Sequence, residues 1–435
     1  MKTQKRFTID KFLLSCFMTL FFLSMPTVLL AFPVMQAIVN QTEENYTEYK
    51  GIVVDRKSGS PLAFASLVVV GTNISTVTNA EGQFSLKIAK ELSNAKIVVS
   101  FLGYKNKAVT LADINPNKPR IELEPISVEL PEISVISKDA EALILAVLAK
   151  KGENYSNEQT FMTAFYRETI KKNRTYVSLS EAVVEVYKQP YLSYKTDIAK
   201  LYKARKKVDY NKLDTVTFKL MGGPFNSLYL DIMKNPEMIF TENMLSNYEF
   251  TFDRSMHTDN RLIYVIDFKQ REGKIEPLYF GKIYIDAKSL AMKSAVFNLN
   301  IKNREMASQM FIKKKPFNAN VYPTEATYRI DYLEKDGKWY YGFSRIELGL
   351  KINWKKKLFN TTYFSTIEMA VTDWKPNTEN VTVSPKERLR PSVVISEEAS
   401  GFSDPDFWGE YNVIEPEKSI ESAIKKIQKQ LEKKK

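Results

Sequence analysis

Histidine and cysteine are almost missing from this chain of 435 residues, which has one of each, His257 and Cys16. Zinc sites, Cys–His nucleophiles and iron–sulfur clusters need several such residues, and a disulfide needs two cysteines. The Gly-x-Ser-x-Gly, Gly-x-Gly-x-x-Gly, Walker and His-Glu-x-x-His motifs are missing as well. We therefore predict that the protein is not an enzyme, and we name no catalytic, cofactor-binding or metal-ligating residue. His257 lies in a polar segment and is predicted to be a surface residue in a loop.

The composition that is present favours a folded β-rich protein. Hydrophobic residues make up 44% of the chain, enough for a sizeable core. Aromatic residues reach 12%, which is typical of pleated sheets. The net charge is +12, and about +9 remains without residues 1–31. An excess of basic residues is typical of proteins that bind nucleic acid or an anionic surface. It also occurs where a basic face is simply solvated and has no partner.

The first 31 residues are predicted to be a secretory signal. Lys2, Lys5, Arg6 and Lys11 precede an apolar run from residue 12 to 32, and cleavage is expected near Ala31 or Ala37. The alternative is an uncleaved anchor, because the run is near the length that spans a membrane. Lipidation of Cys16 is not expected, since only Phe12 separates its flanking box from Lys11 and the apolar run continues beyond it. A mature chain without cysteine fits a bacterial envelope protein, in the periplasm or associated with the outer membrane. An exported chain is not expected to bind nucleic acid.

Residues 50–125 are predicted to fold as a small β-sandwich. Short alternating strands recur at close spacing, and they are separated by turn-rich segments. The segment Asn79-Ala-Glu-Gly82 has Asn at the first and Gly at the fourth position, as a type I turn favours.

These residues resemble the carboxypeptidase-regulatory-like domain. The resemblance is carried by Gly51-Ile-Val-Val-Asp55, Gly59-Ser-Pro-Leu62, Val70-Gly-Thr72, Gly82-Gln-Phe84 and Ser100-Phe-Leu-Gly-Tyr104. It implies a transthyretin-like sandwich without catalytic activity, of the kind found beside carboxypeptidase domains and at the front of TonB-dependent receptors. The whole chain is also similar to Gram-negative envelope proteins that carry this module, through motifs such as Phe165-Tyr-Arg-Glu168 and Phe407-Trp-Gly-Glu-Tyr411. The segment Gly281-Lys-Ile-Tyr-Ile-Asp286 is similar, in addition, to curved-sheet lipoprotein carriers of the periplasm. No activity follows from these similarities.

A linker with a helix, residues 126–160, is expected next. Asp139 can cap a helix that runs through Lys151, with Gly152 as its stop. Residues 161–375 are predicted to form a larger antiparallel domain, because alternating strands follow one another with short turns. The Asp336-Gly337 pair between residues 327–332 and 346–350 predicts a hairpin.

The C-terminal extension, residues 376–435, begins with an aromatic cluster around Trp408 and Tyr411. A helix over residues 416–433 is predicted, with Ile420, Ile424, Ile427 and Leu431 on one face. That face can dock onto the body of the protein, or it can lie on an anionic membrane surface. The fold class is thus mainly β: an N-terminal transthyretin-like sandwich, a larger antiparallel β-rich domain with a linker helix, and a C-terminal amphipathic helix.

Three classes of function remain open: a binding or assembly module of the envelope, a carboxylate-based hydrolase, and a small outer-membrane β-barrel. We predict the first, with an envelope protein, lipid or glycan partner that the sequence does not identify. Strands at residues 262–268 and 279–285 are apolar at nearly every position, so both faces of the sheet need cover. A strongly curved sheet that holds an apolar ligand, such as a lipid chain, would supply it. A sheet that fills its own core is the alternative.

Overall fold

The N-terminal module is a sandwich of two sheets, as predicted. The computed structural model describes residues 45–114, 119–126, 139–208, 220–258, 261–312, 315, 317–355, 360–399, 407–422 and 424, so the signal prediction lies outside the described residues. One sheet has the order β4-β1-β7 and the other β3-β2-β5-β6. The strands are β1 (Tyr46–Asp55), β2 (Ser66–Val69), β3 (Ser75–Val77), β4 (Gln83–Ala89), β5 (Lys96–Ser100), β6 (Lys107–Thr110) and β7 (Arg120–Leu123).

Apolar side chains that alternate with polar ones along these strands build the sandwich core. Phe84 and Leu86 of β4 pack against Leu67 of β2 and Ile97 of β5, and all four side chains are buried. The turn at Asn79 forms as expected, and its side-chain Oδ1 accepts the backbone N–H groups of Glu81 and Gln83 at 2.9 Å. The short helical turns η1 (Lys90–Leu92) and η2 (Leu111–Asp113) complete the module.

The linker helix is present, but it ends differently from the prediction. Helix α1 (Ala140–Ala149) begins after Asp139, whose Oδ1 accepts the N–H groups of Glu141 and Ala142. The predicted stop at Gly152 is wrong, because a second short helix, α2 (Lys151–Asn154), contains that glycine.

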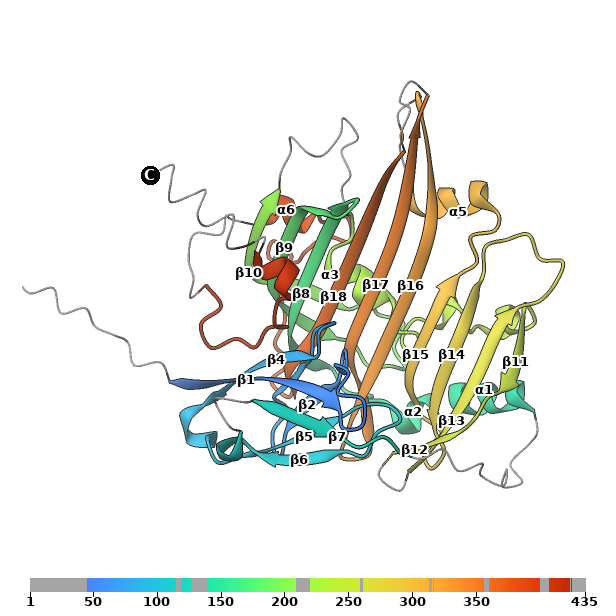
Figure 1. Ribbon diagram of the computed structural model, residues 1–435. Coiled ribbons are helices and arrows are strands. Elements are labelled where there is room, and N and C mark those ends of the chain that lie inside the picture. The colour runs from blue at the N-terminus through green and yellow to red at the C-terminus, as the bar shows by residue number, and fades with distance from the viewer. Residues whose placement is uncertain are drawn as a thin grey trace, which may run out of the picture. The chain divides into compact units, whose positions relative to one another are not determined.

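The larger domain is a sheet of eleven antiparallel strands (Figure 1), which confirms the predicted fold class. Its order is β10-β9-β8-β18-β17-β16-β15-β14-β13-β11, and β12 also pairs with β13. The strands are β8 (Thr160–Lys172), β9 (Thr175–Lys188), β10 (Ile198–Val208), β11 (Tyr248–Phe252), β12 (Met256–Thr258), β13 (Arg261–Gln270), β14 (Tyr279–Asp286), β15 (Met292–Leu299), β16 (Ala319–Lys335), β17 (Lys338–Trp354) and β18 (Thr361–Pro376).

Two meanders make up this sheet, and one long-range pairing joins them. Strands β8 to β10 form the first meander, and β11 to β18 form the second. They meet where β8 pairs with β18, with Arg167 opposite Glu368. The predicted hairpin lies between β16 and β17, and its turn residues Asp336 and Gly337 have φ angles of 51° and 75°, as a type I′ turn requires.

One face of the sheet, here called the inner face, is filled by helices of the same chain. This face carries Tyr166, Ile266 and Ile283, and it packs against α1 and a helical segment that includes Leu228 and Phe240. The segment contains α3 (Pro224–Tyr229), η3 (Pro236–Met238) and α4 (Glu242–Leu245), and the short helix α6 (Ile395–Glu398) lies near β9 and β10. The apolar strands therefore find cover on this face within the chain itself.

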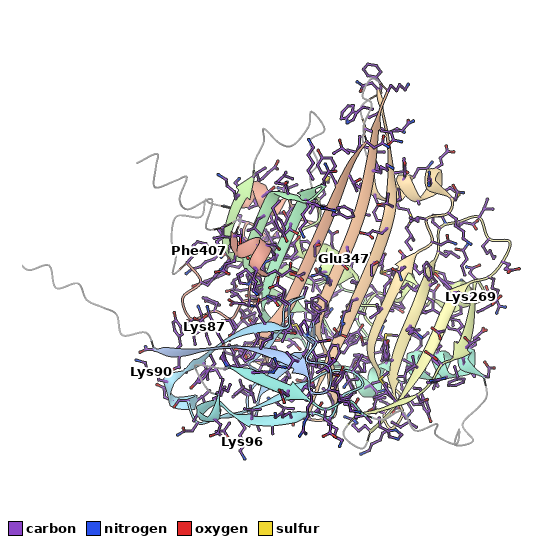
Figure 2. All side chains as sticks on the ribbon, in the orientation of Figure 1. Lys87, Lys90, Lys96, Lys269, Glu347 and Phe407 are labelled. Atoms are coloured by element: carbon purple, nitrogen blue, oxygen red, sulfur yellow. The ribbon has the colours of Figure 1, made fainter. Side chains whose placement is uncertain are left out.

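The opposite, outer face is partly covered by the sandwich and the C-terminal segment, all within the compact unit Asn45–Lys435. Phe64 of the sandwich stacks on Phe343 of β17 with ring centroids 5.4 Å apart. Trp408 meets Phe165 of β8 edge to face at 5.5 Å. The backbone carbonyl of its neighbour Phe407, which is labelled in Figure 2, accepts a hydrogen bond from the Lys203 ammonium of β10 at 3.2 Å. The strands β13 to β15 lie farther along the sheet, and Phe280 on β14 is exposed there.

Candidate binding site on the outer face

A row of alternating charges crosses five strands of the outer face. Strand register places Arg205 of β10 opposite Glu181 of β9, and Glu181 opposite Arg167 of β8. The row continues through Glu368 of β18 to Arg345 of β17. Directly opposite side chains of adjacent strands share one face of a sheet, so this register brings five charges together that are far apart in the sequence.

The centre of the row is a buried ion-pair network. Arg167 and Glu181 are 2% and 1% exposed, and their charged groups are 2.7 Å apart. Arg205 binds the other oxygen of Glu181, also at 2.7 Å. Burial disfavours the charged form of Glu181, but Arg167 and Arg205 outweigh this effect and lower its pKa. Arg167 also donates to the carbonyl of Ile414 at 2.7 Å, so the network fastens the C-terminal segment to the sheet.

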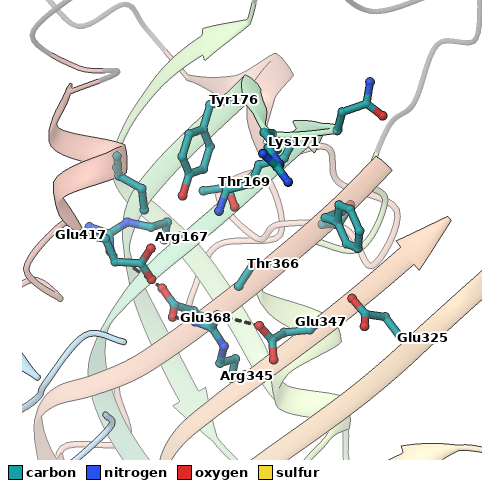
Figure 3. A pocket seen from close by; sticks show the side chains of 15 residues that line it. Arg167, Thr169, Lys171, Tyr176, Glu325, Arg345, Glu347, Thr366, Glu368 and Glu417 are labelled. Atoms are coloured by element: carbon teal, nitrogen blue, oxygen red, sulfur yellow. Dashed lines mark hydrogen bonds and ion pairs between the residues drawn. The ribbon is translucent and has the colours of Figure 1, made fainter. Parts of the chain in front are cut away.

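Beside this network lies a pocket with a volume of about 390 Å³. Its lining carries both charges: Lys171 of β8 and Arg174 of the β8–β9 turn are cationic, and Glu325 of β16 and Glu347 of β17 lie across the pocket from Lys171 (Figure 3). Between them the wall is made of small hydroxyl side chains and two rings, namely Thr169, Thr366, Ser365, Tyr176 and Phe364. The Lys171 ammonium lies 4.5 Å from the centre of the Tyr176 ring. The pocket is therefore dipolar and has an aromatic side.

Two further acids, Glu368 and Glu417, line this pocket, and their surroundings differ. Arg345 binds the carboxylate of Glu347 at 2.8 Å and also pairs with Glu368. Burial disfavours the charged Arg345, but the two glutamates outweigh it and raise its pKa. Glu417 comes from the C-terminal segment, and burial, assisted by the nearby Glu368, raises its pKa. Glu417 therefore holds a proton more readily than an ordinary glutamate does.

A second, shallower depression lies on the outer face over β13 to β15, with a volume of about 560 Å³. Phe280 is 43% exposed there, and Tyr284 and Val296 lie beside it. Lys282 and Asp267 form an ion pair at its edge, at 3.0 Å. This depression, here called the Phe280 groove, combines an apolar floor with a charged rim.

The inner face holds a buried cluster whose role is structural. Lys188 at the end of β9 lies 2.6 Å from Asp197 and 2.7 Å from Asp231, and Tyr332 donates to Asp231 at 2.8 Å. Burial alone would lower the pKa of Lys188, but the two aspartates outweigh it and raise the pKa. Because Asp231 follows α3, this cluster holds the helical segment against the sheet.

Sequence reasoning singled out no site residue, and its placement of His257 in a loop is wrong. His257 lies in strand β12 opposite Leu262, and it is half-buried. Among the described residues, no group of three or more His, Cys, Asp or Glu side chains is placed to hold a metal ion. The pocket residues Arg167 and Arg345 fall in segments that the sequence did mark as strands. Their partners could not be found, because the register between distant strands is not local information.

Comparison with known families identifies the N-terminal module. Residues 49–135 match the family described as the CarboxypepD_reg-like domain. The resemblance seen in the sequence is thereby confirmed, and the matched range includes the sandwich except for the first three residues of β1 and ends before the large sheet. Among curated proteins, nothing matches the chain significantly.

Several solved structures are similar at 10% sequence identity. A DUF1329 family protein from Desulfovibrio piger matches with a TM-score of 0.23, over 57% of this chain and 96% of that one. Lipovitellin, in a structure concerned with its lipid–protein interactions, matches with a TM-score of 0.25, over 54% of this chain and 27% of that one. A protein from Bacteroides fragilis, described as membrane-associated and of unknown function, matches with a TM-score of 0.15, over 75% and 97%. Similarities this low carry no argument about function.

Proposed function

We propose that the protein is a non-enzymatic, exported module of the cell envelope, and that it binds its ligand in the dipolar pocket of the outer face. The observation that carries this proposal is the presence of both charges around one pocket, where Lys171 lies across from Glu325 and Glu347 and the exposed Arg174 adds a second cation. A few polar groups that converge on a concavity are the usual basis of specific binding. The inner face is filled by α1 and the segment around Phe240, so the outer face is the one that can receive a ligand.

The chemistry of the pocket favours a zwitterionic ligand such as a short peptide. The cationic side suits a terminal carboxylate, and the acidic side suits an ammonium group. Tyr176 and Phe364 offer ring surfaces for the body of the ligand. Arg345 holds both Glu347 and Glu368 as ion-paired carboxylates. This pairing supports a role for the two glutamates in binding rather than in proton transfer.

Calorimetry with a series of short peptides tests this proposal. Peptides with free termini should bind, and the same peptides blocked at both ends should bind at least roughly tenfold more weakly, because each loses a charge-assisted contact. Lys171→Gln and Glu325→Gln should each weaken the binding of free peptides. Lys269→Gln, an exposed lysine on β13 (Figure 2), serves as the control. Equal binding of free and blocked peptides, or variants that match the control, would contradict the proposal.

Export is supported by the basic and then apolar character of the first 31 residues. Mass spectrometry of the envelope fraction should find a mature N-terminus between about residues 32 and 40, where small residues permit cleavage. An intact Met1 on membrane-bound protein would instead support an uncleaved anchor.

An apolar ligand on the curved sheet is a second candidate, and the exposed Phe280 favours it. Because the inner face is filled, such a ligand would lie in the Phe280 groove. Ile266 is 0% exposed within the inner core, so Ile266→Asp should unfold the domain by burying an unpaired charge. Tyr284→Asp, on the groove, should leave the fold intact and abolish uptake of a fluorescent fatty acid. A wild-type protein that never takes up the probe would rule out this candidate.

A carboxylate hydrolase is another alternative, and the raised pKa of Glu417 beside Glu368 favours it. A glycosidase pairs a protonated acid with a second, ionised carboxylate. Arg345 and Arg167 both pair with Glu368. This pairing indicates a structural role for Glu368 and so weighs against the hydrolase. Release of reducing sugar from envelope glycan that Glu417→Gln abolishes would establish the hydrolase and overturn the binding proposal.

A further inference from the structure

One end of the large sheet presents an exposed ring among lysines. At this end β16 begins and β17 stops, with Ala319 opposite Trp354. The N–H of Lys355 donates to the carbonyl of Asn318 at 3.0 Å, so the segments before β16 and after β17 lie side by side. Helix α5 (Arg304–Phe311) runs next to β16, where the Ser308 hydroxyl donates to the carbonyl of Val321 at 3.2 Å. We call Met310, Lys315, Phe317, Trp354 and Lys355 the sheet tip.

Burial and charge distinguish the sheet tip from the rest of the surface. Phe317 is 93% exposed and Met310 is 49% exposed, and Lys315 and Lys355 are exposed beside them. None of the five residues of the tip is acidic. The neighbouring β8–β9 turn adds the exposed Arg174, and the N–H of Asn173 in that turn donates to the carbonyl of Thr362 at 2.7 Å. Positive charge therefore surrounds apolar side chains at this end of the sheet.

We propose that the sheet tip docks onto a bilayer that contains anionic phospholipids, with Phe317 in the headgroup region and Lys315 and Lys355 at the lipid phosphates. A ring exposed between lysines matches a membrane interface, which takes the ring into its apolar boundary and attracts the cations. A stable protein partner would need roughly 800 Å² of surface on each side, and five residues at a narrow end do not supply it. The inference is independent of the ligand in the dipolar pocket.

This surface differs from the C-terminal helix as a place of membrane contact. Ile420 and Ile424, on the apolar face of that helix, are buried against Leu179 of β9. The apolar positions Ile427 and Leu431 lie outside the described residues. Within the part of the chain that the structure describes, no helix has the length and apolar character needed to cross a bilayer. The sheet tip offers contact without crossing.

A fluorescent probe at the tip tests the proposal in the full-length chain. Phe317→Cys, combined with Cys16→Ser, gives a single cysteine for an environment-sensitive dye. We expect the dye emission to shift to shorter wavelength with vesicles of phosphatidylcholine and phosphatidylglycerol, but not with phosphatidylcholine alone. Added salt should reverse the shift, because it screens the lysines.

Paired variants assign the contact to the tip. Lys315→Ala with Lys355→Ala should weaken vesicle binding by about 25-fold, as each lysine near an anionic surface contributes about fivefold. Lys90→Ala with Lys96→Ala removes the same charge from exposed positions of the sandwich (Figure 2) and should have little effect. The proposal is wrong if the dye does not respond while the protein sediments with vesicles, since another segment then makes the contact. It is equally wrong if both pairs of variants bind alike, or if neutral vesicles shift the dye as much as anionic ones.

Discussion

Replacing Arg167 by methionine tests whether the buried charge row stabilises the large sheet. The substitution keeps much of the side-chain volume and removes the guanidinium. It breaks the 2.7 Å contacts with Glu181 and with the carbonyl of Ile414, and the 3.8 Å contact with Glu368. Removing one partner of a buried ion pair costs about 3–5 kcal/mol. Because Arg205 still binds Glu181, we expect the lower end, about 3 kcal/mol at neutral pH.

The pH dependence of this loss identifies its cause. In the native protein the two arginines hold the pKa of Glu181 below its ordinary value of 4.5. A depressed folded-state pKa stabilises the protein above the unfolded pKa, and this contribution disappears as the pH falls through the folded pKa. In Arg167→Met, burial is opposed by Arg205 alone, so the pKa of Glu181 should rise. The difference in unfolding free energy between the two proteins should therefore be largest at neutral pH and should shrink below pH 4.5.

Urea unfolding followed by tryptophan fluorescence measures this difference. The four tryptophans are Trp339, Trp354, Trp374 and Trp408, and none lies in the sandwich. Their emission therefore reports on the large sheet and its C-terminal cover. Lys269→Met, in the exposed pair with Glu249 on the large sheet, also replaces a paired cation by methionine, but at the surface, and should alter stability little. A loss in Arg167→Met that is equally large at acidic pH would refute the electrostatic account and indicate lost packing instead.

Three other predictions concern buried groups of the sheet. Lys188→Met leaves Asp197 and Asp231 buried without their cation, and urea unfolding should show a loss of about 3–5 kcal/mol. Burial raises the pKa of Glu168 to about 7. Such a group stabilises the fold below its unfolded pKa, and this contribution is lost as the pH rises through 7, so we expect wild-type stability to fall by about 3 kcal/mol between pH 5 and 8. Glu168→Gln should flatten this fall. Gly281→Ala places a Cβ 2.2 Å from a backbone oxygen of β15, and thermal unfolding should show a destabilisation of about 1–3 kcal/mol. Gly152→Ala in α2 serves as the control, because its Cβ would meet only the exposed, flexible side chain of Leu192, at 3.0 Å, and should cost less.

The sequence by itself determined the local elements of this protein. Alternation of apolar and polar residues is a property of neighbouring positions, so the short strands of residues 50–125 and the Asp336-Gly337 hairpin could be read directly. The same holds for the cap at Asp139, whose side chain bonds to the next N–H groups along the chain. The turn glycines and apolar positions of the sandwich were enough to reveal its resemblance to the CarboxypepD_reg-like domain.

Only the tertiary structure decided how the strands combine and where the charges meet. Arg167 finds Glu368 across the β8–β18 pairing, and with 51 acidic residues in the chain no local pattern could select that partner. The segment around Phe240 lacks a regular period, so its place over the inner face follows from packing against Phe268 and its neighbours rather than from its own sequence. Local periodicity specifies which residues face the same way, whereas strand order and register depend on contacts between distant segments, and the pocket is made from those contacts.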